Sequence, residues 1–544
     1  MRILFIIRHT GYLRHYESVV ELLARHGHEV HIRFNLMPNK AHLGKEQVSR
    51  LCRHYPNVTA DEVPYRRDLW KPLLTHLRGM RDYLRYLHPR YARAPKLVRR
   101  AREHHGWLKA LFFELIPGIR TERVQNWIQS LLRRVEMLVP SSRRIDALIR
   151  ECRPDIVLVT PLVDFGSQQL DYLKSAQTLG IHNVLCVASW DNLTNKGIIQ
   201  LEPEAVIVWN HDQKREAVEL HGIPPEKVIV TGAQSFDKWF ERRPSTTREQ
   251  FCRLHGFDPA RPTILYVCSS AFIAEEEARF ALKWLTHLRS SPDPVVAGAN
   301  VLIRPHPLNA GQWADVDVSE HPRVAIYPRG GAYVSTEQAS AEYFDSIYHS
   351  DAVVGINTSA LIEAGIIGRT SHTILAEEFA DTQEGTLHFD YLIRDGYLKV
   401  ARDLSEHVQQ LRATLDGGEA GKEHVRRFVG AFIRPHGLDQ PCTPIVAHAI
   451  EELARRPQPE PLATTPAVWF ARVVLLPIAI VILCGDLTYR AVRRVCWWAM
   501  RIFRKDKRHE ELAKKAARLP AGSPLHGLIG KGTKSRQAVG SGQG

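Results

Sequence analysis

Short runs of continuous apolar residues, each followed by a polar loop and then by a helical pattern, constrain the fold of this chain most strongly. The first run, RILFII, spans residues 2–7 and ends in a polar stretch that contains Gly11. A helical segment with an apolar face follows, and the next run is EVHIRF at 29–34. Strands that are buried on both faces of a parallel sheet have this continuous apolar character. The repeat therefore predicts a β–α–β unit of an open parallel sheet.

The same alternation returns in two further blocks. Apolar runs stand at 155–160, 183–189, 205–210 and 227–232, and then at 263–270, 300–307, 323–328 and 351–355. The stretch 241–260, with Pro and adjacent Ser and Thr residues, has the composition of a linker. We therefore predict two α/β domains, at 1–240 and 241–456. The loop after the first strand lacks the GxGxxG motif, which argues against NAD binding there.

Residues 65–150 differ in character from both blocks. Between residues 66 and 103 there are twelve Lys and Arg against three acids, with Tyr and Trp interspersed. A solvated helical insertion explains this pattern, and so does a basic surface that lies on an anionic membrane. Nucleic-acid binding is a third interpretation, but no recognised nucleic-acid motif accompanies the charge, so we expect no such partner.

The C-terminal part is separate from the α/β blocks. A polar linker at 457–466 precedes a hydrophobic and basic segment at 467–505, and a basic, flexible tail is expected at 506–544. About 19 apolar residues approach the length of a membrane span, although Arg472 and Pro477 interrupt them. The segment is predicted to be peripheral, re-entrant or single-spanning, with a core helix as the alternative. The eight cysteines form no CxxC pair, which favours reduced thiols over a disulfide frame or zinc site, and no signal peptide is recognised. We therefore expect the cytoplasmic face of a membrane.

Candidate site residues follow the strands of the first block. Gly11 allows a ligand to approach the backbone, and His15 lies near the start of a helix. Asp191, after the strand at 183–189, is a candidate general base toward a hydroxyl, with a structural turn as the alternative. Trp190 is expected either to stack on a sugar or to fill the core.

The second block carries its own candidates. Ser269 and Ser270 stand before a helix, where hydroxyls and backbone amides bind anions. Arg304 and His306 lie in a proline-stiffened loop that suits a diphosphate. Thr358 and Ser359 stand at the start of a helix, where such hydroxyls either bind phosphate or simply cap the helix. Glu363, one turn further on, is expected to reach ribose hydroxyls.

The order of these motifs resembles the GT-B glycosyltransferase superfamily. The stretches VIVTGAQSFD (228–237), RPHP (304–307) and INTS (356–359) carry the resemblance, which covers roughly 1–60 and 150–415. The nearest likeness is to the CDP-glycerol glycerophosphotransferase branch of surface-polysaccharide synthesis. That branch has Asp-Tyr-Ser-Ser where this chain has Ile-Asn-Thr-Ser, so a nucleotide sugar is equally possible as donor. The likeness implies two Rossmann-like domains that face each other across a cleft. It also implies that His306, Thr358 and Ser359 bind pyrophosphate and that Glu363 binds the ribose.

These expectations combine into a membrane-associated transferase. It would move a glycosyl or glycerophosphoryl group from a nucleotide-diphosphate donor to a lipid-linked or polysaccharide acceptor. Asp191, or less favourably His15, would remove the acceptor proton. No cofactor is expected, and a metal is optional. The alternatives are an epimerase similar to the non-hydrolysing UDP-N-acetylglucosamine 2-epimerases and a non-catalytic membrane scaffold.

Overall fold

A computed structural model describes residues 1–35, 44–333, 336–417 and 420–516. It divides into two compact units. The first contains Met1–Asp68 and Leu74–Val468, and the second joins Leu69–Leu73 to the segment from Trp469 onward. The predicted tail from residue 517 and the side chains after Trp497 lie outside what is described.

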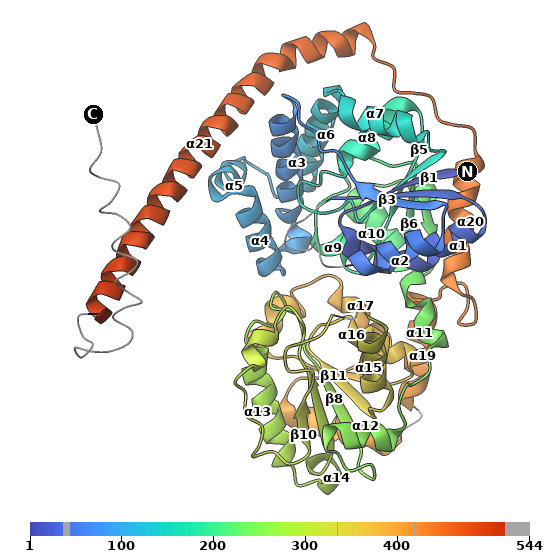
Figure 1. The fold of residues 1–544 in the computed structure, drawn as a ribbon, viewed down its shortest axis with the longest axis vertical. Coiled ribbons are helices and arrows are strands. Elements are labelled where there is room, and N and C mark those ends of the chain that lie inside the picture. Colours follow the sequence, from blue (N-terminus) through green and yellow to red (C-terminus); the bar gives the residue numbers. More distant parts are fainter. Residues whose placement is uncertain (36–43, 334–335, 418–419, 517–544) are drawn as a thin grey trace. The chain divides into compact units, whose positions relative to one another are not determined.

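The first unit contains two parallel sheets with helices on both sides of each (Figure 1). The first sheet has seven strands in the order β3-β2-β1-β4-β5-β6-β7, and every neighbouring pair is parallel. Its strands are β1 (Arg2–Ile7), β2 (Glu29–Phe34), β3 (Val58–Glu62), β4 (Ile156–Thr160), β5 (His182–Cys186), β6 (Ala205–Val208) and β7 (Val228–Val230). Its helices include α1 (Glu17–Arg25), α2 (Lys45–His54), α7 (Arg143–Cys152), α8 (Leu170–Leu179), the short α9 (Asn192–Asn195) and α10 (His211–His221).

The second sheet has six parallel strands in the order β10-β9-β8-β11-β12-β13. Its strands are β8 (Thr263–Val267), β9 (Asn300–Arg304), β10 (Val324–Ile326), β11 (Ala352–Gly355), β12 (Thr370–Ile374) and β13 (Leu398–Ala401). Its helices are α12 (Arg248–His255), α13 (Glu277–Arg289), α14 (Pro294–Ala297), α15 (Glu337–Tyr348), α16 (Ala360–Ile366), α17 (Phe389–Ile393), α18 (Leu404–Leu415) and α19 (Ala420–Phe432). Both sheets have the strand order of a Rossmann-like domain, which confirms the predicted α/β architecture.

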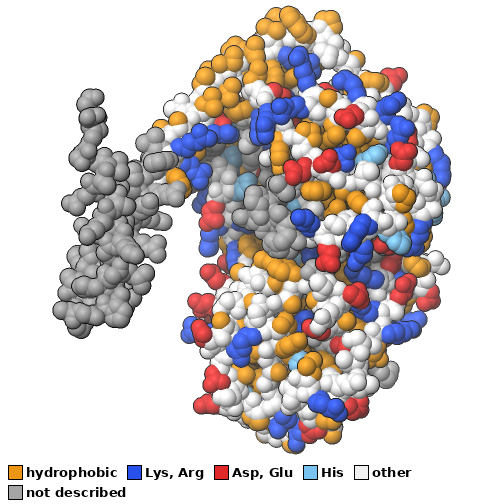
Figure 2. Space-filling view, viewed as in Figure 1, with side chains coloured by type: hydrophobic (Ala, Val, Ile, Leu, Met, Phe, Trp, Pro, Cys, Tyr) orange, Lys and Arg blue, Asp and Glu red, His pale blue; other side chains and the backbone are white. Residues whose placement is uncertain are grey.

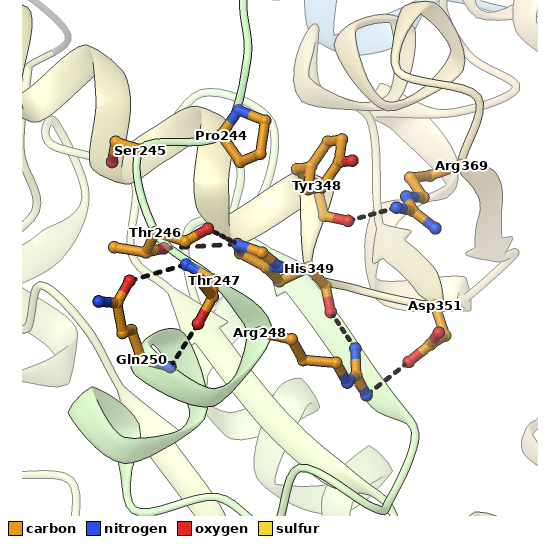
Figure 3. A pocket seen from close by; sticks show the side chains of 10 residues that line it. All are labelled: Pro244, Ser245, Thr246, Thr247, Arg248, Gln250, Tyr348, His349, Asp351 and Arg369. Atoms are coloured by element: carbon orange, nitrogen blue, oxygen red, sulfur yellow. Dashed lines mark hydrogen bonds and ion pairs between the residues drawn. The ribbon is translucent and has the colours of Figure 1, made fainter.

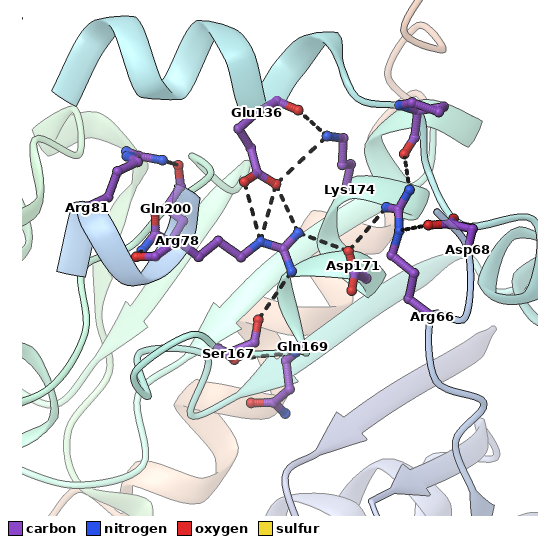
Figure 4. Close-up of polar contacts among 11 residues, drawn as sticks. Arg66, Asp68, Arg78, Arg81, Glu136, Ser167, Gln169, Asp171, Lys174 and Gln200 are labelled. Carbon is purple, nitrogen blue, oxygen red and sulfur yellow. Dashed lines mark hydrogen bonds and ion pairs between the residues drawn. The ribbon is translucent and has the colours of Figure 1, made fainter. Parts of the chain in front are cut away.

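The segment between β3 and β4 is helical, as predicted, with α3 (Lys71–Tyr86), α4 (Pro95–His105), α5 (Trp107–Glu114) and α6 (Glu122–Leu138) before α7. Its positive charge does not all face solvent, because Arg66, Arg78, Arg81 and Arg85 are each at most 6% exposed. Arg78 lies between Glu136 and Asp171, with its Nη2 2.9 Å from an oxygen of each (Figure 4). A buried guanidinium is tolerated only when it is paired in this way. Part of the basic composition is therefore internal and structural.

This insertion also holds the loop that follows β5. Arg85 Nη1 donates to the carbonyl oxygens of Lys196 (3.1 Å) and Gly197 (2.8 Å), and the hydroxyl of Tyr86 donates to the carbonyl oxygen of Lys196 (2.7 Å). The hydroxyl of Tyr91 donates to the carbonyl oxygen of Thr194 at 3.1 Å. Loop backbone groups that lack strand partners need such donors when they are buried. The insertion therefore fixes the segment that carries Trp190 and Asp191.

The chain crosses between the two sheets twice. It leaves the first domain through α11 (Asp237–Glu241) and returns as α20 (Cys442–Arg455), whose buried side chains join the core of the first sheet. Asp237 connects the two crossings, because its carboxylate accepts hydrogen bonds from the Cys442 and Thr443 backbone N–H groups and from Arg434. A carboxylate at a helix N-terminus is stabilised by the helix dipole. The first domain is therefore completed by residues from the far end of the chain.

Helix α21 (Pro466–Ala516) follows the linker. The part at Pro466–Arg494 is 29 residues long, has a mean hydropathy of 2.5 in its most apolar window, and is long and apolar enough to cross a membrane. Trp469, Phe470 and Val481 are more than 60% exposed, and Figure 2 shows mainly hydrophobic side chains along the coloured part of this helix. An apolar helix with so little burial lacks the packing of a core helix.

Candidate functional site

The predicted site residues lie where parallel sheets bind ligands, in loops after the carboxyl ends of strands near the point where strand order reverses. That point falls between β1 and β4 in the first sheet and between β8 and β11 in the second. Gly11 and His15 follow β1 in a short 3-10 helix, η1 (Thr10–His15). Ser269 and Ser270 follow β8, His306 follows β9, and Thr358 and Ser359 follow β11.

Within η1, backbone and side-chain contacts fix the orientation of His15. His9 Nδ1 accepts a hydrogen bond from the Gly11 backbone N–H at 3.2 Å, which caps the turn. Arg14 Nε donates to His15 Nε2 at 3.2 Å, so Nε2 is the unprotonated nitrogen. Burial lowers the pKa of His15 well below its usual value, and Arg14 and Lys196 lower it further, whereas Asp191 opposes them. His15 is therefore a neutral imidazole at pH 7.

Asp191 lies among groups that favour its ionised form. Asn195 Nδ2 donates to Oδ2 of this carboxylate at 3.0 Å. Burial acts to raise the pKa of Asp191, but the Lys196 cation and the hydrogen bonds from Ser189 and Asn195 outweigh burial and hold that pKa well below its usual range. A carboxylate that is so strongly stabilised is a weak proton acceptor.

Trp190 connects the two domains. Its indole Nε1 donates to Ser359 Oγ at 3.2 Å, and its ring lies edge-on to His388 with centroids 4.7 Å apart. The residue is only 5% exposed. Of the two roles predicted for Trp190, the core role fits this burial, because a covered ring offers no free face to a sugar. Burial lowers the pKa of His388 to about 4, although Asp191 opposes the shift, so this ring is also neutral at pH 7.

The loops after β8 and β11 contact each other. Ser269 is fully buried, its backbone N–H donates to Glu277 Oε2 at 2.6 Å, and its Oγ accepts from the Asn357 backbone N–H at 3.5 Å. The Ser270 carbonyl oxygen accepts from the Ile273 and Ala274 N–H groups at 2.9 and 3.0 Å. Thr358 Oγ1 accepts from the Ala360 N–H at 3.4 Å, near the start of α16. The hydroxyls of Ser269 and Thr358 thus have structural partners in this state of the protein.

Arg304, Tyr343 and Glu363 form a connected set. The Arg304 guanidinium lies over the Tyr343 ring, 5.1 Å from its centroid, and the Tyr343 hydroxyl donates to Glu363. Arg304 Nη1 donates to Ser346 Oγ at 3.0 Å, whereas its Nη2 is buried and has no hydrogen-bond partner among the described residues. Burial raises the pKa of Glu363 to about 7, with the Tyr343 hydrogen bond and Arg14 acting against it. Arg304 therefore keeps donor capacity beside Tyr343, whose hydroxyl binds a carboxyl with a pKa near neutral pH.

Arg14 is the residue that the sequence prediction missed. The pKa of His306 is lowered mainly by burial, and the charge of Arg14 lowers it further. The same charge also lowers the pKa values of Glu363 and His15. The charge of one arginine of the first domain thus influences both predicted ligand groups of the second. Its position beside His15 in the loop after the first strand was the available signal.

A cavity of about 600 Å³ lies elsewhere, beside the linker before α12 (Figure 3). It is lined by Pro244, Ser245, Thr246, Thr247, Arg248, Gln250, Tyr348, His349, Asp351 and Arg369. None of the predicted site residues lines it. Arg248 is engaged with the His349 carbonyl (2.8 Å) and Asp351 (3.3 Å), and Arg369 with the Tyr348 carbonyl, so these cations serve the packing of the linker.

Comparisons with known proteins reveal distant structural likeness and no relative by sequence. The sequence matches no protein-family model and no curated protein. UDP-GlcNAc 2-epimerase from Methanocaldococcus jannaschii is similar in structure, with 12% identity, a TM-score of 0.44, and coverage of 78% of this chain and 98% of that one. The Staphylococcus aureus MnaA–UDP structure has 11% identity, a TM-score of 0.47 and coverage of 85% and 100%. A glycosyltransferase from Rickettsia africae has 11% identity, a TM-score of 0.46 and coverage of 84% and 99%.

Proposed function

We propose that this chain is a membrane-associated transferase that takes a glycosyl or glycerophosphoryl group from a nucleotide-diphosphate donor. One observation carries the proposal: the loop after β5 of the first domain meets the loop after β11 of the second, where Trp190 Nε1 donates to Ser359 Oγ at 3.2 Å. Loops that follow the carboxyl ends of strands in both domains thus meet. Such a meeting point suits a nucleotide held by one domain and an acceptor held by the other.

The donor's diphosphate would bind among Arg14, Arg304 and His306. The buried, unpartnered Nη2 of Arg304 supports this assignment, because a buried donor without an acceptor costs about 1–3 kcal/mol. Ser269, Thr358 and Ser359 would shape the two loops that enclose the phosphates. Glu363 would accept hydrogen bonds from the ribose when it is ionised.

His15 suits the role of general base better than Asp191. The pKa of Asp191 is held very low, whereas His15 is a neutral imidazole whose pKa is lowered first by burial and then by the cations Arg14 and Lys196. A bound diphosphate would offset the charge of Arg14 and so raise the pKa of His15 toward neutrality. Asp191 would then stabilise the imidazolium that forms. In this scheme donor binding strengthens the base.

The acceptor is proposed to be lipid-linked or a growing glycan at the cytoplasmic face of a membrane. The long apolar stretch at Pro466–Arg494 supports membrane attachment. Trp127 and Leu131, one turn apart on α6, are 67% and 45% exposed, and Arg123 and Arg134 are exposed on the same helix. Apolar side chains flanked by arginines are typical of helices that lie at an anionic lipid surface.

Ligand-induced thermal stabilisation tests the donor assignment. CDP, UDP, GDP and CMP would each be added to the full-length chain, to Arg14→Gln and His306→Ala variants, and to the control Arg279→Ala. Arg279 is on α13, and its side chain is 88% exposed. We expect one of the diphosphates to stabilise the wild type and the control. Each site variant should weaken that binding by about tenfold or more, the loss of one charge-assisted hydrogen bond.

Assays of the preferred donor, with and without an acceptor, then distinguish the transferase from the epimerase and the scaffold. A glycosyltransferase releases the nucleoside diphosphate, and a glycerophosphotransferase the nucleoside monophosphate, only when an acceptor is present, whereas an epimerase changes the sugar without one. A scaffold would show no turnover in either case. Equal stabilisation of the wild type and both site variants by every nucleotide would contradict the proposed binding site.

A further inference from the structure

A second cluster of ligand-type side chains lies away from the strand ends just described. His26 follows α1, His28 precedes β2, and Glu451 belongs to α20. One potential ligand atom from each residue lies within 4.8 Å of the other two. The first domain thus supplies two imidazoles from the segment His26-Gly27-His28, and the returning helix supplies a carboxylate.

Both imidazoles contact the same carboxylate. His26 Nδ1 lies 2.7 Å and His28 Nε2 lies 3.0 Å from the same carboxylate oxygen, Glu451 Oε1. The side chains of His28 and Glu451 are 12% and 10% exposed, whereas that of His26 is 46% exposed. Two ligands are therefore held in the interior, and the third leaves the centre open to water on one side.

Two features around the cluster restrict its geometry. The second oxygen of Glu451 is 3.2 Å from Arg455 Nη2, one turn along α20, which orients the carboxylate. Gly27 has φ = +81°, a conformation that favours glycine and reverses the chain so that both imidazoles face α20. Outer contacts that orient a ligand raise the affinity of a metal site.

We propose that His26, His28 and Glu451 bind one divalent transition-metal ion, with Zn²⁺ as the best match. Two imidazole nitrogens and one carboxylate oxygen form a donor set that Zn²⁺ accepts, with water as the fourth, tetrahedral ligand. Mg²⁺ and Ca²⁺ prefer sites built from oxygen atoms, and this cluster offers only one carboxylate. Only small movements would be needed to place all three ligands around one ion.

Such an ion would fasten α20 to the first domain. The N-terminal end of α20 is already held by Asp237, which accepts from the Cys442 and Thr443 N–H groups. The metal would hold the C-terminal half of the same helix against the α1–β2 corner. A ligand that binds only the folded state stabilises that state, so Zn²⁺ should raise the unfolding temperature.

The test measures Zn²⁺ binding by the tag-free, full-length chain after treatment with EDTA. Isothermal titration calorimetry with ZnCl₂ would be run on the wild type and on His28→Gln and Glu451→Gln variants. The matched control is His448→Gln, which removes an exposed histidine that lies 3.4 Å from Glu452 on the same helix. We expect one tight site per chain in the wild type and the control. The His28 and Glu451 variants should bind at least about tenfold more weakly, since even second-shell changes alter affinity about 10- to 100-fold.

Spectroscopy and unfolding provide an independent readout. Co²⁺ in this site should show the intense visible absorption of a tetrahedral complex in the wild type and in His448→Gln, but not in Glu451→Gln. If Glu451→Gln were poorly folded, the His26→Gln variant, at the most exposed ligand, would serve instead. Equal Zn²⁺ affinity in the wild type and the three ligand variants would overturn the proposal, and so would an unfolding temperature that Zn²⁺ fails to raise.

Discussion

At the scale of single residues, the loop that carries Ser269 depends on a buried carboxyl. Glu277 is fully buried and accepts hydrogen bonds from the Ser269 backbone N–H (2.6 Å) and the Tyr266 hydroxyl (3.4 Å). Burial raises the pKa of Glu277 to about 8, and the hydrogen bonds only partly oppose it. Glu277 is thus protonated at neutral pH while it orders a predicted donor-binding loop.

This assignment predicts a pH dependence of stability. The folded-state pKa of about 8 lies above the ordinary value of 4.5, so the folded chain binds more protons than the unfolded chain between these two values. The contribution of Glu277 to the free energy of unfolding should therefore fall as pH rises through this window, by at most about 1.4 kcal/mol per pH unit. Glu277→Gln keeps an acceptor for Ser269 but cannot ionise. Unfolding followed from pH 5 to 8 should show a weaker decline in the variant, and parallel curves would contradict the assignment.

Residue chemistry could be predicted from the sequence only in part. Histidines and hydroxyls in loops after strands were identifiable, because the carboxyl ends of parallel strands are the usual ligand positions. The protonation states were not, since the pKa values of His15, Asp191 and Glu363 depend on burial and on charges from distant segments. Arg14 escaped prediction for the same reason, because its effect on the pKa of His306 depends on the folded chain.

At the scale of elements, the apolar runs in the sequence predicted ten of the strands, namely β1, β2 and β4 to β11. The structure adds β3, β12 and β13. The sequences of β3 and β12, VTADE and TSHTI, are polar, and β3 and β13 are the edge strands of their sheets. Edge strands need fewer apolar residues, and the buried hydroxyls of β12 are satisfied by hydrogen bonds, such as that from Thr373 Oγ1 to the Ile356 carbonyl (3.0 Å). The positions of such strands are determined by contacts with neighbouring segments and not by an apolar pattern of their own.

At this scale we predict that helix α21 attaches the chain to membranes. A chain that ends at residue 465 lacks the apolar stretch at Pro466–Arg494 and should lose most of its binding to vesicles of phosphatidylcholine and phosphatidylglycerol. Flotation of both proteins on a density gradient measures this. An alkaline carbonate wash then separates an integral segment, which stays in the membrane, from a peripheral one, which is released. Equal flotation of the two chains would show that attachment lies elsewhere.

At the scale of the whole molecule, the first domain is discontinuous in sequence. Val446, Ala447 and Ile450 of α20 are fully buried in the core of the first sheet. No local pattern in α20 indicates which sheet it joins, because an amphipathic helix shows only that it has a partner. This pairing is fixed by the whole fold.

The discontinuity predicts how fragments behave. A fragment of residues 1–240 leaves the α20-binding surface uncovered and should aggregate, since an exposed apolar surface of this kind drives association. Joining 1–241 to 442–456 through a short Gly-Ser linker should restore a monomer, because Asp237 contacts the N-terminus of α20 directly. Size-exclusion chromatography distinguishes the two fragments. A soluble, monomeric 1–240 fragment would mean that α20 is dispensable.

The double crossing at Asp237 also bears on how such a protein can exchange parts during evolution. A single recombination point inside the gene would separate one crossing segment from its mate and break the contacts of Asp237 with Arg434 and Cys442. A new second domain can enter intact only as a cassette with two junctions, one after α11 and one before α20. The second domain would then diversify by cassette replacement or by point substitution, whereas the first domain would change through its own inserted helices.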